Sequence, residues 1–181
     1  MIGDAAMAVL AADGNKGLTH RSVDRWLGWP EGTTSRYHRT RDSLMNAVVR
    51  RLVEVEVAHI EQWESDQTRQ PKTTINDVAA ILHKTYLEWV QGNVRHIARY
   101  ELSLEARRRP VVEDAIVAGR QALNDSIGRL MTAIGCINPD VHATSVVSLL
   151  DGMVHDQLLH PEIATPPSEV EDIFRRWLQS C

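Results

Sequence analysis

The chain has 181 residues, of which 43% are hydrophobic and 24% are charged, as in an ordinary globular protein. This length is sufficient to bury a core in one large domain or two small ones. No apolar run of about 18 residues occurs, which excludes a membrane span. No secretory leader opens the chain either, so we expect a cytoplasmic protein. The formal net charge of −4 by itself argues against a nucleic-acid partner.

Apolar residues at helical spacing begin the chain. Ile2, Ala5, Ala6, Val9 and Leu10 recur at three- and four-residue intervals, which is the spacing of one face of an α-helix. We expect this face to pack against the helices that follow it.

The next segment, residues 17–44, predicts two short helices joined by a tight turn. Its sequence is GLTHRSVDRWLGWPEGTTSRYHRTRDSL. Thr19 is a natural N-cap for a helix that runs to about Leu27, and Gly28 can leave that helix in the left-handed conformation. Pro30 suits the first turn of a second helix. Two helices arranged in this way form a helix-turn-helix.

The second of these helices, residues 31–37, is polar and has little to bury. It offers hydroxyl and guanidinium donors of the kind that a DNA groove accepts. Arg36 could reach a guanine edge or a phosphate, or it could be a solvated surface arginine. Glu31 could accept from a cytosine amine, or it could complement the positive end of the helix dipole. The candidate DNA-binding residues are Thr19, Arg21, Glu31, Thr33, Ser35, Arg36, Tyr37 and Arg41.

The distribution of charge qualifies the argument from the net charge. Residues 1–50 carry seven Lys and Arg against five Asp and Glu, a balance of +2, and the remainder of the chain carries −6. Three of the basic residues, Arg36, Arg39 and Arg41, lie where a helix-turn-helix meets phosphates. An acidic second domain can keep such a protein dissolved without contacting DNA.

Helical periodicity continues through the remainder of the chain. The expected helices cover residues 41–64, 75–91, 94–107, 110–135, 138–160 and 168–179, with loops at 67–72 and 165–167. Asn138 and Pro139 suit a cap and a first turn, and Ser168 with Glu171 forms a capping-box pattern. No strand pattern competes, so we expect an all-α protein of about nine helices. Three of them form a DNA-binding head in residues 1–45, and six form a bundle in residues 46–181.

Three further groupings favour structural roles. The spacing of Cys136 and Cys181 fits neither a metal site nor a redox motif, so we expect reduced thiols. Glu56 and His59 form one Glu-x-x-His, whereas a di-iron site needs a second copy and further carboxylates. Arginines 107–109 suit a solvated helix end, where cations meet the negative end of the dipole. We therefore expect no cofactor and no metal.

The helix-turn-helix resembles that of the tetracycline-repressor (TetR) family of bacterial transcriptional regulators. The residues that match the family pattern directly are Gly14, Gly17, Leu18, Thr19, Arg21, Val23, Gly28, Gly32, Thr33 and Leu44, with Arg41 at its basic position. The segment GTTSRYHRTRD resembles a variant found in one subgroup. In the family the position of Arg21 can also reach a base or a phosphate.

The chain also departs from the family pattern at four positions. Asp24 replaces an alanine, Ser35 a tyrosine, Tyr37 a histidine and His38 a core phenylalanine. For His38 we favour a hydrogen-bonded core histidine.

The resemblance implies a small-molecule pocket in the bundle and a homodimer. The candidate ligand-binding residues are Trp63, Tyr86, Trp89, His96, Tyr100, Asp151 and His155. Such aromatic residues could equally be plain core. The candidate dimer residues, on the last two long helices, are Val146, Leu149, Leu150, Met153, Phe174 and Trp177, some of which must be internal.

Two functions follow as hypotheses. The first is a homodimeric repressor that binds a double-stranded DNA operator and is released by a small-molecule effector. The second is a helical ligand carrier or enzyme with a vestigial helix-turn-helix. The sequence lacks the common catalytic motifs, which favours the first hypothesis.

Overall fold

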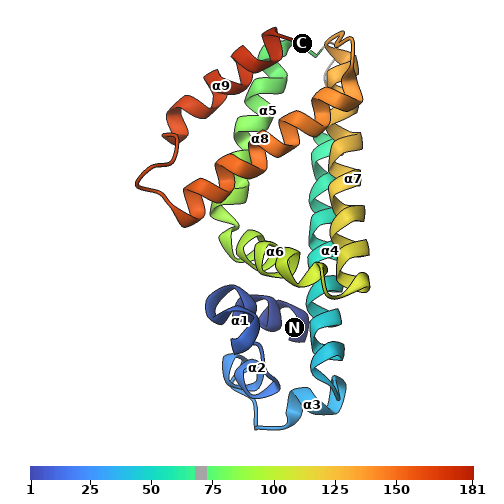
Figure 1. Ribbon diagram of the computed structural model, residues 1–181, viewed down its shortest axis with the longest axis vertical. Coiled ribbons are helices and arrows are strands. Elements are labelled where there is room, and N and C mark those ends of the chain that lie inside the picture. Colours follow the sequence, from blue (N-terminus) through green and yellow to red (C-terminus); the bar gives the residue numbers. More distant parts are fainter. Residues whose placement is uncertain (68–72) are drawn as a thin grey trace. The chain divides into compact units, whose positions relative to one another are not determined.

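The computed structural model describes residues 1–67 and 73–181, without the side chains of residues 56–57, 59–67 and 111. These residues form nine α-helices and no strand (Figure 1), which confirms the expected all-α class. The helices are α1 (Ile2–Gly17), α2 (His20–Leu27), α3 (Thr33–Tyr37), α4 (Arg41–Gln67), α5 (Ile75–Gln91), α6 (Asn93–Ala106), α7 (Pro110–Ala133), α8 (Pro139–Leu159) and α9 (Pro167–Gln179). The expected loop at 67–72 and the Glu56–His59 pair fall outside what is described.

Several helix ends follow the expected capping chemistry. The hydroxyl of Thr19 accepts a hydrogen bond from the backbone N–H of Ser22 at 3.1 Å, and Gly28 ends α2 with a φ of 67°. Pro139 stands in the first turn of α8, although the side chain of Asn138 makes no capping hydrogen bond. Near the end of α1, Gly14 has a φ of 67° and kinks the helix.

Two expected helix starts are wrong. The helix α3 begins at Thr33, so Pro30 and Glu31 lie in the turn before it and not in its first turn. The helix α9 begins at Pro167, and no side chain caps it. Glu171 is therefore not part of a capping box; its carboxylate accepts a hydrogen bond from Arg175 at 2.6 Å.

The chain forms two compact units. The first comprises residues 1–59 and 94–119, and the second comprises residues 60–93 and 120–181. The helix α4 contributes to both. This division differs from a boundary at residue 45, because residues 41–59 of α4, 94–106 of α6 and 110–119 of α7 group with the helix-turn-helix. A functional boundary at residue 45 stays a prediction.

Each unit has its own apolar core. In the first unit, α1 packs on α2 and α2 on α3; fully buried side chains there include Leu10, Leu18, Val23, Leu44 and Leu102. In the second unit, α5 packs against α8 and α9, and its fully buried side chains include Leu82, Val146, Leu150 and Phe174. No helix in the described part of the chain is long and apolar enough to cross a membrane.

Cys136 and Cys181 form a disulfide in the second unit. The first lies in the turn after α7 and the second follows α9; their sequence separation is 45 and their Cα atoms are 5.4 Å apart. The expectation of two reduced, separate thiols is therefore wrong. Their spacing in the sequence gives no sign of the pairing, because α8 and α9 fold back and return the chain to the α7–α8 turn (Figure 1).

Reduction of this disulfide should lower the free energy of unfolding by about 2–4 kcal/mol, because the bond restricts the unfolded chain across a long loop. Urea unfolding with and without a phosphine reductant, in the presence of a chelator, measures the difference. Cys181→Ser is the control, since its stability should not respond to the reductant. Equal stability of the wild type under both conditions would contradict the prediction.

Candidate DNA-binding surface

A buried carboxylate fixes the turn between α2 and α3. The side chain of Asp24, 1% exposed, lies on the inner face of α2. Its Oδ2 accepts from the backbone N–H of Gly32 at 2.8 Å. Its Oδ1 accepts from the backbone N–H of Thr34 at 2.8 Å and from the Thr34 hydroxyl at 2.6 Å. Asp24 thus pairs N–H groups at the start of α3 that would otherwise lack partners.

The protonation of Asp24 is set by these contacts. Burial alone would raise the pKa of the carboxyl, but the hydrogen bonds from Thr34 and Gly32 outweigh burial and hold its pKa below the ordinary value of 3.8. Asp24 is therefore ionised at neutral pH. In the sequence, Asp24 stands out only as a departure from the alanine of the family pattern. The signal in the sequence was an acidic residue beside Val23, on the apolar face of the expected helix. A carboxylate buried there requires hydrogen-bond donors.

The geometry of α3 divides its polar side chains into two groups. The hydroxyl of Thr33 donates to the Pro30 carbonyl at 2.6 Å, and that of Ser35 donates to the Gly32 carbonyl at 2.8 Å. Both hydroxyl groups therefore donate their hydrogens to acceptors inside the helix-turn-helix. Arg36 is exposed and Tyr37 is 69% exposed. Among the described residues, no acidic group pairs with the Arg36 guanidinium.

Four of the candidate residues line one open hollow between the starts of α2 and α3. They are Thr19, Arg21, Glu31 and Ser35, and His20 and Gly32 complete the lining. Arg21 and Glu31 form an exposed ion pair with an N–O distance of 3.7 Å. Such a pair contributes little to stability, so Arg21 can exchange it for a phosphate.

Arg41 lies at the start of α4 and is already engaged. Its Nη2 donates to the Asn15 side-chain oxygen at 2.7 Å and to the Asn15 backbone carbonyl. This contact joins α4 to the last turn of α1. A phosphate contact by Arg41 stays a prediction, and it would have to use the remaining donors of the guanidinium.

His38 follows α3 and is half-buried. Its Nδ1 lies 3.2 Å from the Ser43 hydroxyl, which agrees with a hydrogen-bonded histidine at this position. Burial, together with nearby Arg50, lowers its pKa below 6.5. His38 is therefore largely neutral at pH 7 and adds little to the positive charge of this end.

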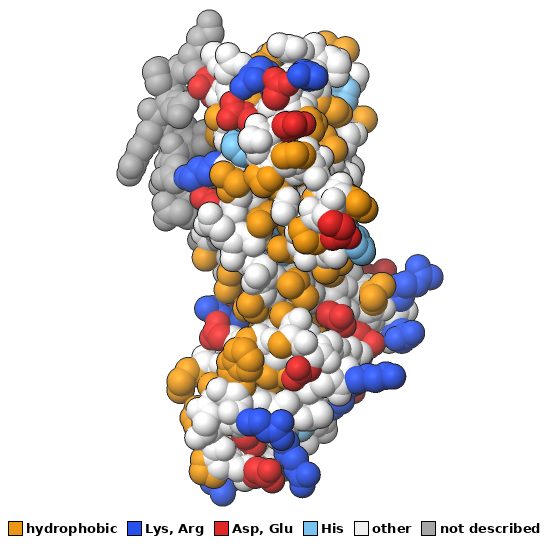
Figure 2. All heavy atoms as spheres, turned by 90° about the vertical axis from the view of Figure 1, so that its left-hand side faces the viewer, with side chains coloured by type: hydrophobic (Ala, Val, Ile, Leu, Met, Phe, Trp, Pro, Cys, Tyr) orange, Lys and Arg blue, Asp and Glu red, His pale blue; other side chains and the backbone are white. Residues whose placement is uncertain are grey.

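The exposed cations of residues 1–50 belong to the same unit. Lys and Arg side chains project around the helix-turn-helix, with some acidic side chains between them (Figure 2). The exposed basic residues are Lys16, Arg21, Arg25, Arg36, Arg39, Arg41 and Arg50.

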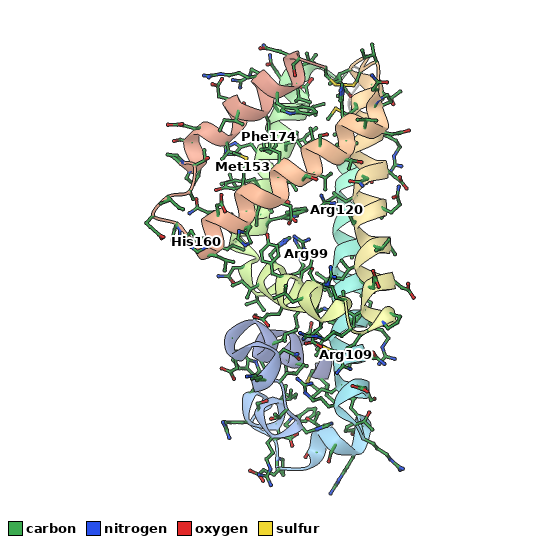
Figure 3. The ribbon with its side chains drawn as sticks, in the orientation of Figure 1. Arg99, Arg109, Arg120, Met153, His160 and Phe174 are labelled. Carbon is green, nitrogen blue, oxygen red and sulfur yellow. A yellow bond between two sulfur atoms is a disulfide. The ribbon has the colours of Figure 1, made fainter. Side chains whose placement is uncertain are left out.

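Arg109 is not the solvated helix-end residue that the sequence suggested. Its side chain (Figure 3) bonds Glu105 at 3.2 Å and pairs with Asp42 at the start of α4. The Arg109 guanidinium lowers the pKa of Asp42. The turn between α6 and α7 is in this way tied to the base of the helix-turn-helix.

The structure does not gather the candidate ligand residues into one unit. Tyr86, Trp89, Asp151 and His155 lie in the second unit, and His96 and Tyr100 lie in the first. The side chain of Trp63 is not described. Tyr86 and Trp89 belong to the apolar core of their unit, and the Tyr86 hydroxyl donates to Gln157 at 3.1 Å. Burial raises the pKa of Tyr86.

The remaining polar candidates have partners within their own units. Asp151 accepts from Arg120 at 3.4 Å, and His155 lies 3.2 Å from Asp156. His96 is buried at 1% exposure. The ring of Tyr100 lies 5.0 Å from the guanidinium carbon of Arg99.

Half of the candidate dimer residues are internal. Val146, Leu150 and Phe174 are fully buried within one chain, so they are internal residues of the kind that the expectation allowed for. Leu149, Met153 and Trp177 are half-buried beside them. Figure 3 shows Met153 on α8 and Phe174 on α9. The helical period that predicted this face cannot separate its inward from its outward edge.

Comparisons with known proteins agree with this architecture. Residues 73–180 match the family model described as "Tetracyclin repressor-like, C-terminal domain". A transcriptional regulator from Rhodococcus sp. has 17% identity and a TM-score of 0.79, over 99% of this chain and 92% of that one. A member of the TetR family from Streptomyces coelicolor A3 has 27% identity and a TM-score of 0.68, over 97% and 95%.

A third similar structure is the multidrug binding protein EbrR in complex with proflavin. It has 28% identity and a TM-score of 0.57, over 97% of this chain and 96% of that one. The comparison with curated proteins finds no match.

Replacing Asp24 with alanine should destabilise the first unit by about 2–3 kcal/mol, because two buried donors of Thr34 and the part-buried N–H of Gly32 lose their acceptor. Operator binding should fall even where the variant remains folded, since α3 loses its anchor. Chemical unfolding and a DNA mobility shift measure the two effects. Arg25→Ala, an exposed change on the same helix, is the control and should leave stability unchanged.

The stability that Asp24 provides should depend on pH. Its folded pKa lies below its unfolded value, so the contribution is fully present above the unfolded pKa and is lost as pH falls through the folded pKa. The difference in unfolding free energy between wild type and Asp24→Ala should be constant near neutral pH and shrink below about pH 4. A difference that grew on acidification would contradict an ionised Asp24.

Proposed function

The chain belongs to the tetracycline-repressor family of transcriptional regulators, a family that is not enzymatic. We propose that it is a homodimeric repressor that a small molecule releases from DNA. Its ligand would be an aromatic compound that enters the second unit. The main support is the exposed face of α3. Arg36 and Tyr37 point away from the core there, on a helix whose start is held by a buried carboxylate.

The proposal for DNA binding rests on preorganisation. Because Asp24 pairs with Gly32 and Thr34 inside the motif, α3 has one orientation relative to α2. An arginine on such a helix can present its fork to the O6 and N7 atoms of guanine. Arg21 and the other exposed cations would contact the flanking phosphates, which position the protein but carry no sequence information.

The proposal for dimerisation rests on the outer face of α8. Ser145, Ser148 and Gly152 are exposed along it, and Val141 is 65% exposed. Small side chains allow a second helix to approach closely. With α9 alongside, two chains would form a four-helix contact and hold two heads about 34 Å apart, the spacing of successive major grooves.

The proposal for an aromatic ligand draws on the similar structures. EbrR has been crystallised with proflavin and with ethidium. In this chain the second unit has Trp89 and Tyr86 on α5, and α5 packs against α8, which carries Asp151 and His155. Aromatic walls with a few polar groups are typical of small-molecule sites. Contacts of His96, Tyr100 and Trp63 with such a ligand stay predictions.

A link between ligand and DNA could run through α4, which contributes residues to both units. In the first unit, Glu101 of α6 accepts from the backbone N–H of Asn15 at 3.2 Å, and Arg109 pairs with Asp42. These contacts hold the start of α4 and the end of α1 to α6. We propose that a ligand favours another arrangement of α4 and that ligand and DNA therefore weaken each other's binding.

A ligand carrier with a vestigial helix-turn-helix is the competing function. It would bind the same ligands but show no sequence preference on DNA. A mobility shift on the DNA upstream of the chain's own gene, against random DNA at several salt concentrations, separates the two.

Arg36→Ala should reduce affinity for the specific site by about 1–3 kcal/mol and relax preference at one base position, because a bidentate contact is lost. Arg36→Lys is the matched control. Lysine keeps the charge, so the salt dependence of binding should be unchanged. It lacks the two-pronged guanidinium, so this variant should also lose discrimination between bases at that position. Equal losses of affinity for specific and random DNA would show that Arg36 contacts only a phosphate.

Leu149→Glu should give a folded monomer, because it places an unpaired charge in the proposed interface. Leu150→Glu, one position further along α8, should instead unfold the second unit, since that side chain is fully buried. Analytical ultracentrifugation and circular dichroism distinguish these outcomes. A folded Leu149→Glu dimer would place the interface elsewhere.

Proflavin or ethidium should bind and lower operator affinity by about 5- to 150-fold, the range of ordinary allosteric coupling. Trp89→Phe should change the affinity for the dye while leaving operator binding of the ligand-free protein intact. Trp26→Phe is the control, because Trp26 lies on α2 and is 58% exposed. If both variants bind the dyes equally well, Trp89 does not contact the ligand.

A further inference from the structure

The second unit brings two sulfurs and one imidazole together. His142 lies in the first turn of α8, and its Nδ1 is 2.9 Å from the sulfur of Cys136 and 2.7 Å from that of Cys181. All three side chains are partly buried, and their donor atoms lie within 4.8 Å of one another. No other group of three or more His, Cys, Asp or Glu residues with this proximity occurs in the described part of the chain.

The three residues come from separate places in the sequence. Cys136 belongs to the α7–α8 turn, where Gly135 has a φ of 84° and turns the chain back. The N–H of Cys136 donates to the Met131 carbonyl at 3.0 Å, and the N–H of Cys181 donates to the Leu178 carbonyl at 3.2 Å. A backbone contact thus holds Cys136 to the end of α7, and another holds Cys181 to the end of α9.

The oxidised pair is one of two states that this geometry allows. In compartments where DNA is bound and transcribed, glutathione and thioredoxin keep most thiols reduced. A reduced pair beside a histidine nitrogen has the donor set of a thiophilic d10 cation: two thiolates and one imidazole.

We propose that Cys136, Cys181 and His142, once the disulfide is reduced, form a binding site for one Zn²⁺ ion. The sulfurs and the Nδ1 of His142 would supply three ligands, and the fourth tetrahedral position would hold a water molecule or an exogenous ligand. The disulfide and the metal exclude each other, because a sulfur within a disulfide is not a thiolate.

The chemistry of the exchange balances with a dithiol as reductant. The dithiol is oxidised to its own disulfide, and the sulfurs of Cys136 and Cys181 gain its two electrons and two protons. Zn²⁺ then displaces both thiol protons, which pass to the buffer, and His142 binds in its neutral form. Two sulfurs bound to one zinc lie about 3.8 Å apart at tetrahedral angles, so the two cysteine side chains would have to move apart when zinc binds.

The disulfide and the bound Zn²⁺ would each join the same two places in the fold, the α7–α8 turn and the segment after α9. The ring of His142 also lies edge-on to Trp177 of α9, with 5.6 Å between the centroids. Reduction in the absence of metal releases this connection, and Zn²⁺ restores it. The site goes beyond the proposed repressor function and does not depend on DNA or on an aromatic ligand.

The test uses Co²⁺ as a spectroscopic probe on the full chain. Protein reduced with a phosphine under nitrogen is titrated with Co²⁺, then with Zn²⁺. We expect one Co²⁺ per chain, a near-ultraviolet thiolate-to-cobalt absorption band, loss of the band on addition of Zn²⁺, and no band from the oxidised protein. Zn²⁺ should also raise the melting temperature of the reduced protein.

Variants separate the proposed site from adventitious binding. His142→Gln keeps both cysteines and should weaken Zn²⁺ binding at least about tenfold, whereas His160→Gln, at the other end of α8, should not. Cys136→Ser should abolish the thiolate band, with circular dichroism confirming that the variant is folded. Failure of reduced wild-type protein to bind Co²⁺, or equal binding by the oxidised protein or by His142→Gln, would overturn the proposal.

Discussion

The proposed DNA-binding surface depends on one buried carboxylate. Asp24 lies between α2 and α3, and its oxygens accept from two backbone N–H groups and one hydroxyl. Because a buried charge is costly without donors, this arrangement tolerates little displacement of α3. The position of Arg36 and Tyr37 follows from that anchor, although neither contacts Asp24. A short helix of five residues, Thr33–Tyr37, would otherwise have little to hold it in place.

Within the first unit, polar contacts extend the same constraint from the helix-turn-helix to α4 and α6. Asn15 at the end of α1 contacts Arg41 of α4 and Glu101 of α6, and Asp42 is paired with Arg109. Three helices therefore meet the base of the helix-turn-helix through polar contacts of defined geometry. Polar contacts of this kind can be exchanged at lower cost than a packed apolar core can be rearranged. Such contacts would suit the proposed release of DNA by a ligand, in which the base of the helix-turn-helix changes its position.

The second unit is stabilised in a different way. Its core is apolar and continuous from α5 to α8 and α9, and a covalent bond joins the segment after α9 to the α7–α8 turn. Tyr86 and Trp89 are part of that core, so an aromatic ligand there would have to share space with residues that also support the fold. A site that binds through core residues couples ligand binding to stability, as ligand linkage requires.

The sequence by itself determined the fold class, most helix bounds and the helix-turn-helix, because helical periodicity, Thr19 and Gly28 are local signals that act over one or two turns. The exposure of Arg36 could also be predicted locally, since a polar helix near the start of the chain has little to bury. Only the tertiary structure decided the contacts between residues that are far apart in the sequence. It assigned Asp24 its donors, paired Cys136 with Cys181 and placed Leu150 inside and Leu149 at the edge. Each of these depends on how separate helices pack, and a periodic pattern records only which residues share a face, not what that face meets.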